Sequence, residues 1–344
     1  MRVRGNGLIY QRSRLKDFLF QSEVVKKIYM DILSMNNVST VNFVTLNVLK
    51  SVSTIQQHLS RLFKKTVYIV GTAMKYVLFV QSKRGSIMKQ NERLDYLIQY
   101  LINESKQYEH LLSVQSLNEK KRILRSLMNI REPMPISREF LKIQDEYLQE
   151  ELKSQQIISI QDLALLKPQL YLWKGDITKL QVDAIVNAGN NALLGCFIPC
   201  HSCIDNAIHS YAGIQLRLEC QKIMEQQNSP EPTGKAKITK GYNLPAKYVL
   251  HTVGPIIHGA LSKKDCLLLA SCYRSCLELA EAYHLKSVAF CCISTGEFHF
   301  PNDIAGKIAI QTVTEYIQET HSEIEVVFNV FKEEDYQIYQ RLLE

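Results

Sequence analysis

The 344-residue sequence lacks an apolar run of the roughly 18 residues that a membrane-spanning helix needs. Its first residues also lack the apolar segment of a secretory signal, so we expect a cytoplasmic protein with no membrane partner. The nine cysteines are an odd number and several lie in apolar segments, which argues against a disulfide-stapled fold and for a reducing compartment. No internal repeat or low-complexity tract is present.

Acidic residues are scarce in the first quarter of the chain. Residues 1–89 carry 15 lysines and arginines but only 3 acidic residues, a net charge of +12, whereas the remainder carries −5. Residues 51–62 and 66–80 resemble the recognition helix and wing of a winged helix-turn-helix, although a solvated basic extension is the simpler interpretation. Basic composition alone does not establish nucleic-acid recognition, and we expect no nucleic-acid partner.

The extension also permits a third interpretation, which concerns the gene. Residues 83–86, directly upstream of Met88, read KRGS, and purine-rich codons of a ribosome-binding site can encode such a run. Organised sequence begins immediately afterwards. Residues 1–87 are therefore either a basic, winged-helix-like extension or the product of an over-called start.

Two further segments follow. Residues 88–166 form a predicted helical N-terminal segment, with helices expected over 91–103, 116–128 and 137–152 from the spacing of their apolar positions. Ser137 is the expected N-cap of the third helix. These helices carry no catalytic constellation, and we expect them to pack against the domain that follows, which spans 167–344.

Strands and helices alternate from residue 169 onward. Short apolar strands are predicted at 170–173, 183–187, 236–241, 248–253, 287–293 and 323–330. Helices are predicted at 203–224, 266–283, 304–319 and 333–343. This alternation indicates a layered α/β domain with a mainly parallel sheet, in which ligands collect at the carboxyl ends of the strands.

Residues 195–205 read GCFIPCHSCID and gather thiols and an imidazole at short spacing. Cys196, His201 and Cys203 would give zinc three protein ligands and leave a fourth position for water or substrate, as in catalytic zinc sites. Cys200 is an alternative ligand. A loop of buried thiols is the competing interpretation, but a proline-broken run with histidine between cysteines fits it poorly. We therefore expect Zn²⁺ as the cofactor.

Three other loops follow predicted strands. Asp176, in the run GDIT at 175–178, could accept a hydrogen bond from an exocyclic amine such as that of adenine, or could cap a short helix. The asparagines of 187–191 suit the vicinal hydroxyls of a ribose, or form a polar turn. The run ISTGEF at 293–298 can present backbone N–H groups to a diphosphate.

Taken together, these loops resemble those of a macrodomain. The resemblance is carried by VDAIVNAGN at 182–190, IDNAIHSYAG at 204–213 and ISTG at 293–296, in this order and spacing. It runs from about residue 170 to the C-terminus. It implies a three-layer α/β/α fold that follows the N-terminal helical segment, a cleft that binds ADP-ribose and, as in many members, hydrolysis of ADP-ribose from proteins.

The resemblance assigns roles to individual residues. Asp176 would hold adenine with Ile177 beside it, while Asn187 and Asn190 would flank the distal ribose. Asp205 occupies the position of the catalytic aspartate, and Asn190 would fix the ribose beside it. The diphosphate loop would comprise Ser294, Thr295, Gly296, Glu297 and Phe298.

The chain departs from the general macrodomain pattern before Asp205. Hydrolase macrodomains carry glycines there, whereas this chain carries the cysteine and histidine run of 196–203. That run, with the preceding helices, resembles the zinc-containing macrodomains of Firmicutes. The resemblance implies a substrate with mono-ADP-ribose on an acidic side chain, and as functional partners a sirtuin-type ADP-ribosyltransferase and a lipoyl-carrier protein. A smaller departure is His299, where many relatives carry glycine.

Several mechanisms and functions remain open from the sequence. Asp205 could orient water or accept its proton, with attack at either the anomeric carbon or an ester carbonyl. A cysteine hydrolase that uses Cys196 or Cys203 as nucleophile is a competing mechanism, and its activity would survive chelation. A non-catalytic ADP-ribose reader and a macrodomain-linked DNA-binding regulator are the competing functions.

Overall fold

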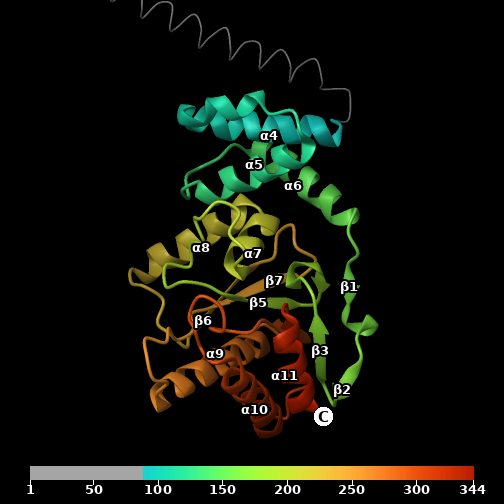
Figure 1. Ribbon diagram of the computed structural model, residues 1–344, viewed down its shortest axis with the longest axis vertical. Coiled ribbons are helices and arrows are strands. Elements are labelled where there is room, and N and C mark those ends of the chain that lie inside the picture. The colour runs from blue at the N-terminus through green and yellow to red at the C-terminus, as the bar shows by residue number, and fades with distance from the viewer. Residues whose placement is uncertain (1–87) are drawn as a thin grey trace, which may run out of the picture. The chain divides into compact units, whose positions relative to one another are not determined.

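The computed structural model describes residues 88–344, and Met88–Glu344 forms one compact unit (Figure 1). The predictions for 1–87, namely the winged helix and the over-called start, lie outside the described residues. Within 88–344, no helix combines the length and the apolar character that crossing a membrane requires.

The chain begins with three α-helices, close to where the sequence predicts them. They are α4 (Gln90–Glu104), α5 (Leu117–Ile130) and α6 (Arg138–Lys153), with the 3-10 helix η1 (Lys106–Ser113) between the first two. Ser137 caps α6 as predicted, because its hydroxyl accepts a hydrogen bond from the amide of Phe140 at 3.1 Å. Apolar side chains at helical spacing, such as Leu94 and Leu97, are buried where α4 meets α5 and α6.

A seven-stranded sheet follows, in the order β2-β3-β9-β8-β5-β7-β6. Its strands are β2 (Leu165–Lys167), β3 (Leu170–Lys174), β5 (Ala184–Ala188), β6 (Ala236–Lys240), β7 (Tyr248–Thr252), β8 (Ser287–Phe290) and β9 (Glu325–Val330). Only the edge strands β2 and β6 pair in an antiparallel manner, which confirms the prediction of a mainly parallel sheet. The short strand β2 and the two-residue pair β1 (Ile158–Ser159) and β4 (Leu180–Gln181) are not predicted from the sequence.

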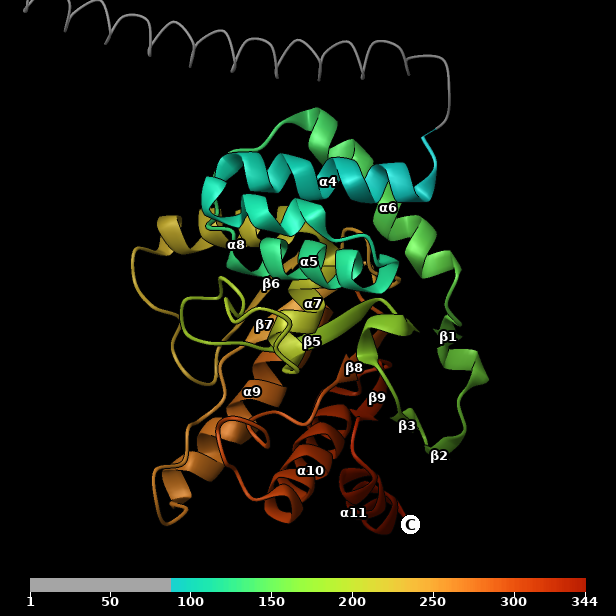
Figure 2. The ribbon, with the colours of Figure 1, turned by 45° about the horizontal axis from the view of Figure 1, so that its top comes forward.

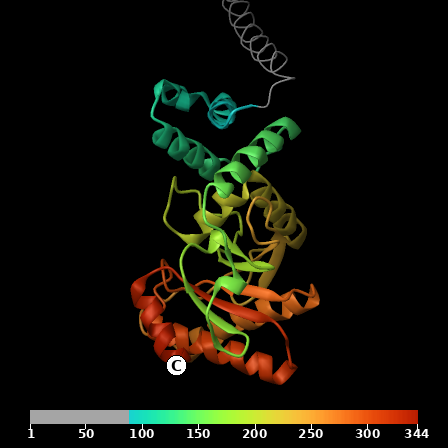
Figure 3. The same ribbon diagram turned by 90° about the vertical axis from the view of Figure 1, so that its right-hand side faces the viewer.

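Helices cover both faces of this sheet, which gives the three layers (Figures 1 and 2). One face carries α7 (Ile204–Ala212) and α8 (Ile214–Gln227), and α5 packs on α7. The other carries α9 (Lys263–Ala282), α10 (Asn302–Thr320) and α11 (Glu333–Leu343). Figure 3 shows the helical segment above the α7 and α8 layer, on the side of the molecule away from α10.

The prediction of one continuous helix over 203–224 is wrong. The chain breaks at Gly213, which has a φ of 97°, and α8 begins immediately afterwards. A side chain at this position would be strained, and a Cβ would lie 2.6 Å from Nε2 of Gln144 in α6. The break therefore lets α6 pack closely against the start of α8.

The central strands place the predicted loops at one edge of the sheet. β5 and β8 are buried on both faces, as expected for parallel strands under helices. The amide of Gly175 donates to the carbonyl of Val330 at 2.9 Å, and that of Gly189 to Thr252 at 3.0 Å. These bonds tie neighbouring strand ends together, so the loops after β3, β5, β7 and β8 leave the sheet side by side.

Candidate active site at the carboxyl edge of the sheet

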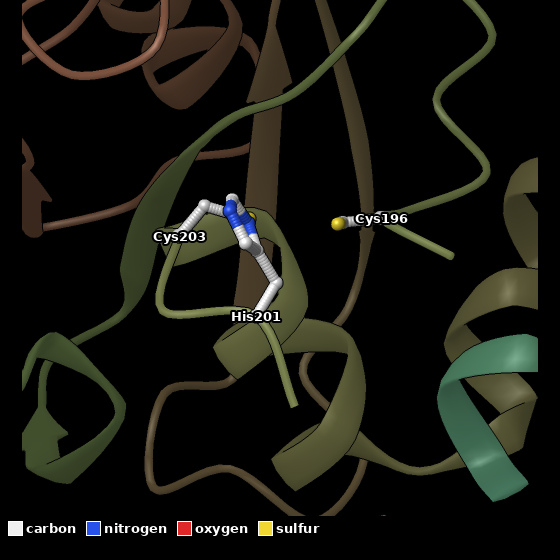
Figure 4. A group of neighbouring side chains, drawn as sticks. All are labelled: Cys196, His201 and Cys203. Carbon is white, nitrogen blue, oxygen red and sulfur yellow. The ribbon is translucent and has the colours of Figure 1, made fainter. Parts of the chain in front are cut away.

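The loop after β5 brings together the three predicted metal ligands. One ligand atom from each of Cys196, His201 and Cys203 lies within 4.8 Å of the others. Figure 4 shows the sulfur of Cys196 directed toward the imidazole of His201, with Cys203 beside the ring. The Nδ1 atom of His201 is buried and has no hydrogen-bond partner among the described residues. Two sulfurs and an unpartnered imidazole nitrogen are a donor set that fits zinc.

Cys203 also begins the helix that carries the predicted catalytic aspartate. It is the N-cap of α7, and its sulfur accepts a hydrogen bond from the amide of Asn206 at 3.4 Å. Burial, together with the nearby Cys196 and Asp205, raises the pKa of this thiol to about 12, against the hydrogen bond from the Asn206 amide, which lowers it. A divalent cation between the two sulfurs would favour both thiolates and reverse this effect.

Cys200, the alternative ligand, faces away from this group. Its φ is +51°, and its sulfur lies 3.2 Å from the hydroxyl of Ser126 in α5. It lines a cavity of about 490 Å³ between α5, α6 and α7, together with Tyr211. The geometry therefore favours the trio without Cys200.

Asp205 lies in the first turn of α7 and is buried. Its Oδ1 accepts a hydrogen bond from Nδ2 of Asn187 at 2.8 Å, which joins two of the predicted site residues. Burial raises the pKa of Asp205 to about 6, against the hydrogen bond from Asn187 and the charge of Arg217, which both lower it. The carboxylate is thus held in a shielded position beside Asn187, the asparagine predicted to flank the distal ribose.

Asn187 is itself oriented by a histidine on the neighbouring strand. Asn187 of β5 and His251 of β7 are register partners, and Nδ2 of Asn187 lies 3.2 Å from Nδ1 of His251. Nε2 of His251 lies 2.9 Å from the hydroxyl of Thr239. Burial lowers the pKa of His251 to about 3, so the neutral ring accepts from Asn187 and donates to Thr239. Oδ1 of Asn187 is buried without a partner among the described residues, which leaves it available to a ribose hydroxyl.

Two buried histidines, His209 and His251, lie outside the trio of predicted metal ligands. His209 is buried behind Asp205, with its Nε2 3.5 Å from Oδ1 of the carboxylate. With Cys220 and His251 it forms a second group whose ligand atoms lie within 4.8 Å of one another. Both ring nitrogens of His251 already have partners, so we assign this group to the support of Asp205 and Asn187. A histidine inside an apolar strand was the signal that could have identified His251.

The loop after β3 confirms the capping role that the sequence offered for Asp176. Its Oδ1 accepts hydrogen bonds from the amide of Thr178 at 3.0 Å and from the hydroxyl of Thr178 at 2.6 Å. It thereby caps the 3-10 helix η3 (Ile177–Lys179), in which Ile177 is buried. Oδ2 has no partner among the described residues and can still accept from an amino group.

Asn190 shapes the start of the segment 195–203, which carries the predicted metal ligands (the metal loop). Its Nδ2 donates to the carbonyl of Gly195 at 3.2 Å, and its Oδ1 accepts from the amide of Ala192 at 3.0 Å. An amide side chain has two N–H bonds and two oxygen lone pairs. One of each therefore remains for a hydrogen bond to the distal ribose.

The loop after β8 has the form expected of a diphosphate cradle. Ser294 has a φ of 66°, and its buried hydroxyl has no partner among the described residues. A Cβ on Gly254 would lie 2.0 Å from that hydroxyl, so glycine is required where the loop after β7 passes it. The hydroxyl of Thr295 donates to the carbonyl of Cys292 at 3.0 Å, which tightens the turn.

The same loop reaches the predicted metal ligands. Oε1 of Glu297, an exposed side chain, lies 3.8 Å from Nε2 of His201. A Cβ on Gly296 would meet open space, and the carbonyl of Phe298 accepts from the amide of Ile257 at 2.9 Å. The metal loop and the predicted diphosphate loop thus lie next to each other, as a ligand that spans both would require.

Comparison with known proteins identifies the class. The Macro domain family matches residues 186–309. A protein-ADP-ribose hydrolase of Treponema medium is 51% identical over 260 residues, which are 74% of this chain and 100% of that protein. One of Staphylococcus aureus is 48% identical over 256 residues, 74% of this chain and 96% of that protein. The chain therefore belongs to the macrodomain family.

A solved structure agrees with this assignment. The Trypanosoma brucei macrodomain in complex with ADP-ribose aligns with a TM-score of 0.51 at 30% identity, covering 67% of this chain and 97% of that one. Within the family, the chain is thus similar over almost the full length of bacterial proteins that are named protein-ADP-ribose hydrolase.

Proposed function

We propose that the protein is a zinc-dependent hydrolase that removes mono-ADP-ribose from modified proteins. Its close relatives are named protein-ADP-ribose hydrolases, which supports the reaction. The observation that carries the zinc dependence is the trio Cys196, His201 and Cys203, whose ligand atoms converge at the start of the helix that bears Asp205.

The predicted cleft residues would bind ADP-ribose along the strand ends. Oδ2 of Asp176 accepts from the adenine amino group, and Ile177 packs beside the base. The diphosphate binds the backbone N–H groups of this loop that donate to no other described group, those of Ser294, Gly296, Glu297 and Phe298. Oδ1 of Asn187 holds the distal ribose together with the remaining N–H bond and oxygen lone pair of Asn190. This places the anomeric carbon of the ribose toward the metal loop.

The reaction is hydrolysis of the bond between the ribose and the modified side chain. Water oxygen bonds to the anomeric carbon or to the ester carbonyl, the linking C–O bond breaks, and Asp205 accepts the proton that water loses. When bound, zinc supplies a Lewis acid at this linkage. In attack at the anomeric carbon, the side-chain carboxylate departs without needing a proton, which supports acidic side chains as the modified residues. In attack at the ester carbonyl, the acyl C–O bond breaks, and the ribose oxygen departs and takes up the proton that Asp205 accepted. The products are ADP-ribose and the free acid.

We also propose the functional partners that the cysteine and histidine loop suggests. The substrate would be a mono-ADP-ribosylated protein, with a lipoyl-carrier protein as the candidate. A sirtuin-type ADP-ribosyltransferase would install the modification that this enzyme removes.

The test compares substrates that carry ADP-ribose on an acidic residue or on serine, with and without chelation. We expect release from the acidic residue, loss of that activity when a chelator removes the metal, and recovery when zinc is returned. Activity that persists after chelation would instead support the cysteine hydrolase. Binding of ADP-ribose without release from either substrate would support the reader.

A further inference from the structure

Helix α5 of the N-terminal segment contacts the metal loop at His201, one of the proposed ligands, and at Cys200, the residue before it. The guanidinium of Arg125 donates to the backbone carbonyl of His201 at 3.1 Å through Nη2. The same side chain donates to Oδ1 of Asn206 at 2.8 Å from Nη2 and at 3.3 Å from Nε. One residue earlier, the amide of Cys200 donates to Oδ1 of Asn129 at 2.9 Å.

The contact at Cys200 fixes an unfavourable backbone conformation. Cys200 has a φ of +51°, a region that L-residues other than asparagine, aspartate and histidine seldom adopt. Asn129 is 1% exposed, and its Nδ2 donates to the hydroxyl of Ser210 in α7 at 2.8 Å. The Asn129 amide therefore spans α5, α7 and the metal loop, and holds the residue that precedes His201.

Asn206 extends this support to another ligand. Its Nδ2 donates to the carbonyl of Ile198 at 2.9 Å and to that of Cys196 at 3.4 Å. Its own backbone amide donates to the sulfur of Cys203. Because Arg125 holds Oδ1 of this fully buried side chain, α5 is linked through Asn206 to the other two proposed ligands.

The far end of α5 is anchored to the same region. Nη1 of Arg217 donates to the last carbonyls of α5, those of Met128 at 3.1 Å and Asn129 at 2.8 Å. Its Nε donates to the carbonyl of Leu194 at 2.7 Å, and its guanidinium lies 4.3 Å from the ring centroid of Phe197. Arg217 thus fixes the end of α5 against the entry to the metal loop.

We propose that α5 positions the zinc ligands, with Arg125 and Asn129 as positioning residues. This inference rests on the proposed function, and it gives the helical segment a part in catalysis beyond packing. Groups that orient the ligands of a metal change its affinity by about 10- to 100-fold when they are removed. Neither residue contacts the adenine or diphosphate loops in the described hydrogen bonds, so ADP-ribose binding should be preserved.

The test uses the full chain with Arg125→Ala and a matched control, Arg122→Ala. Arg122 lies one turn earlier on α5, is exposed, and contributes only its backbone carbonyl to Cys200. Zinc affinity is measured by competition with a chromogenic chelator, ADP-ribose affinity by calorimetry, and turnover separately as kcat and KM. The absorption spectrum of the cobalt-substituted proteins reports ligand geometry.

We expect Arg125→Ala to weaken zinc about 10- to 100-fold, to alter the cobalt spectrum and to lower kcat, with ADP-ribose affinity unchanged. Arg122→Ala should behave as wild type. Arg125→Lys keeps the charge without the forked contacts and should fall between them, and it decides the question if the alanine variant does not fold.

Zinc affinity and cobalt spectra that match wild type in both Arg125 variants would overturn the positioning role while leaving the zinc hydrolase intact. A wild-type protein that binds no zinc would overturn both inferences.

Discussion

The buried His251 should make the protein sensitive to acid, and His251→Asn should reduce that sensitivity. In the folded protein, burial lowers the pKa of His251 to about 3, whereas an unfolded histidine has a pKa near 6.5. The unfolded state therefore binds more protons between these values, so the free energy of unfolding falls as pH falls through that window. The asparagine introduced in His251→Asn places an amide oxygen or nitrogen near the position of the His251 Nδ1 atom, but it does not titrate.

The size of the effect follows from the shift in pKa. At pH 5 the unfolded state gains about 2 kcal/mol from protonating this one residue, with an upper limit of about 5 kcal/mol that is reached well below pH 3. His209, whose pKa burial also lowers, acts in the same direction, and Asp205, whose pKa is raised, acts in the opposite direction. Both are present in the variant, so their own contributions largely cancel in the difference between the two proteins. His251 also lowers the pKa of His209, so its removal makes His209 less acid-sensitive and acts in the same direction.

Urea unfolding at pH 7 and pH 5, with chelator present, measures this difference. The loss of stability between the two pH values should be smaller by about 2 kcal/mol in His251→Asn than in wild type. Equal losses in the two proteins would show that His251 is not a neutral buried residue, and would remove the basis for its hydrogen bond to Asn187.

Four other substitutions test the site. Asp205→Asn should lower kcat by about 10²- to 10⁴-fold while ADP-ribose still binds, which turnover and calorimetry can separate. Gly254→Ala should cost about 1–3 kcal/mol and weaken ADP-ribose binding, because its Cβ would lie 2.0 Å from the hydroxyl of Ser294; unchanged binding would argue against that loop as the diphosphate cradle. Cys200→Ala should retain zinc and Cys196→Ala should lose it, as measured by metal analysis, and the reverse result would exchange their roles.

Local pattern was sufficient to predict most of the fold. The apolar run at 287–293 predicts a strand, and β8 forms over the first four of these residues, Ser287–Phe290. The helix at 333–343 begins and ends at the predicted residues. The break at Gly213 was not predictable from apolar spacing, because the amphipathic pattern continues through it and the reason for the break is the approach of Gln144 from α6. Strands of two or three residues, such as β2, carry too few positions to show a period.

The candidate site likewise contains residues that the local sequence predicts and residues that only the fold brings together. Ligands close together in sequence, such as Cys196 and Cys203, could be grouped from spacing alone. The pairing of Asn187 with His251 depends on the register of β5 against β7, and the contact of Arg125 with the metal loop depends on how α5 packs on α7. Such contacts between residues some 60 to 80 positions apart leave no local signal in a single sequence.

We propose that zinc held by the cysteine and histidine loop is required for release of ADP-ribose. The most direct measurement determines metal content and release of ADP-ribose from an ester-linked mono-ADP-ribosylated protein on the same samples of wild type and Cys203→Ala. We expect about one zinc per chain and hydrolysis in wild type, with both lost in the variant. Full hydrolysis by a metal-free protein would contradict the account.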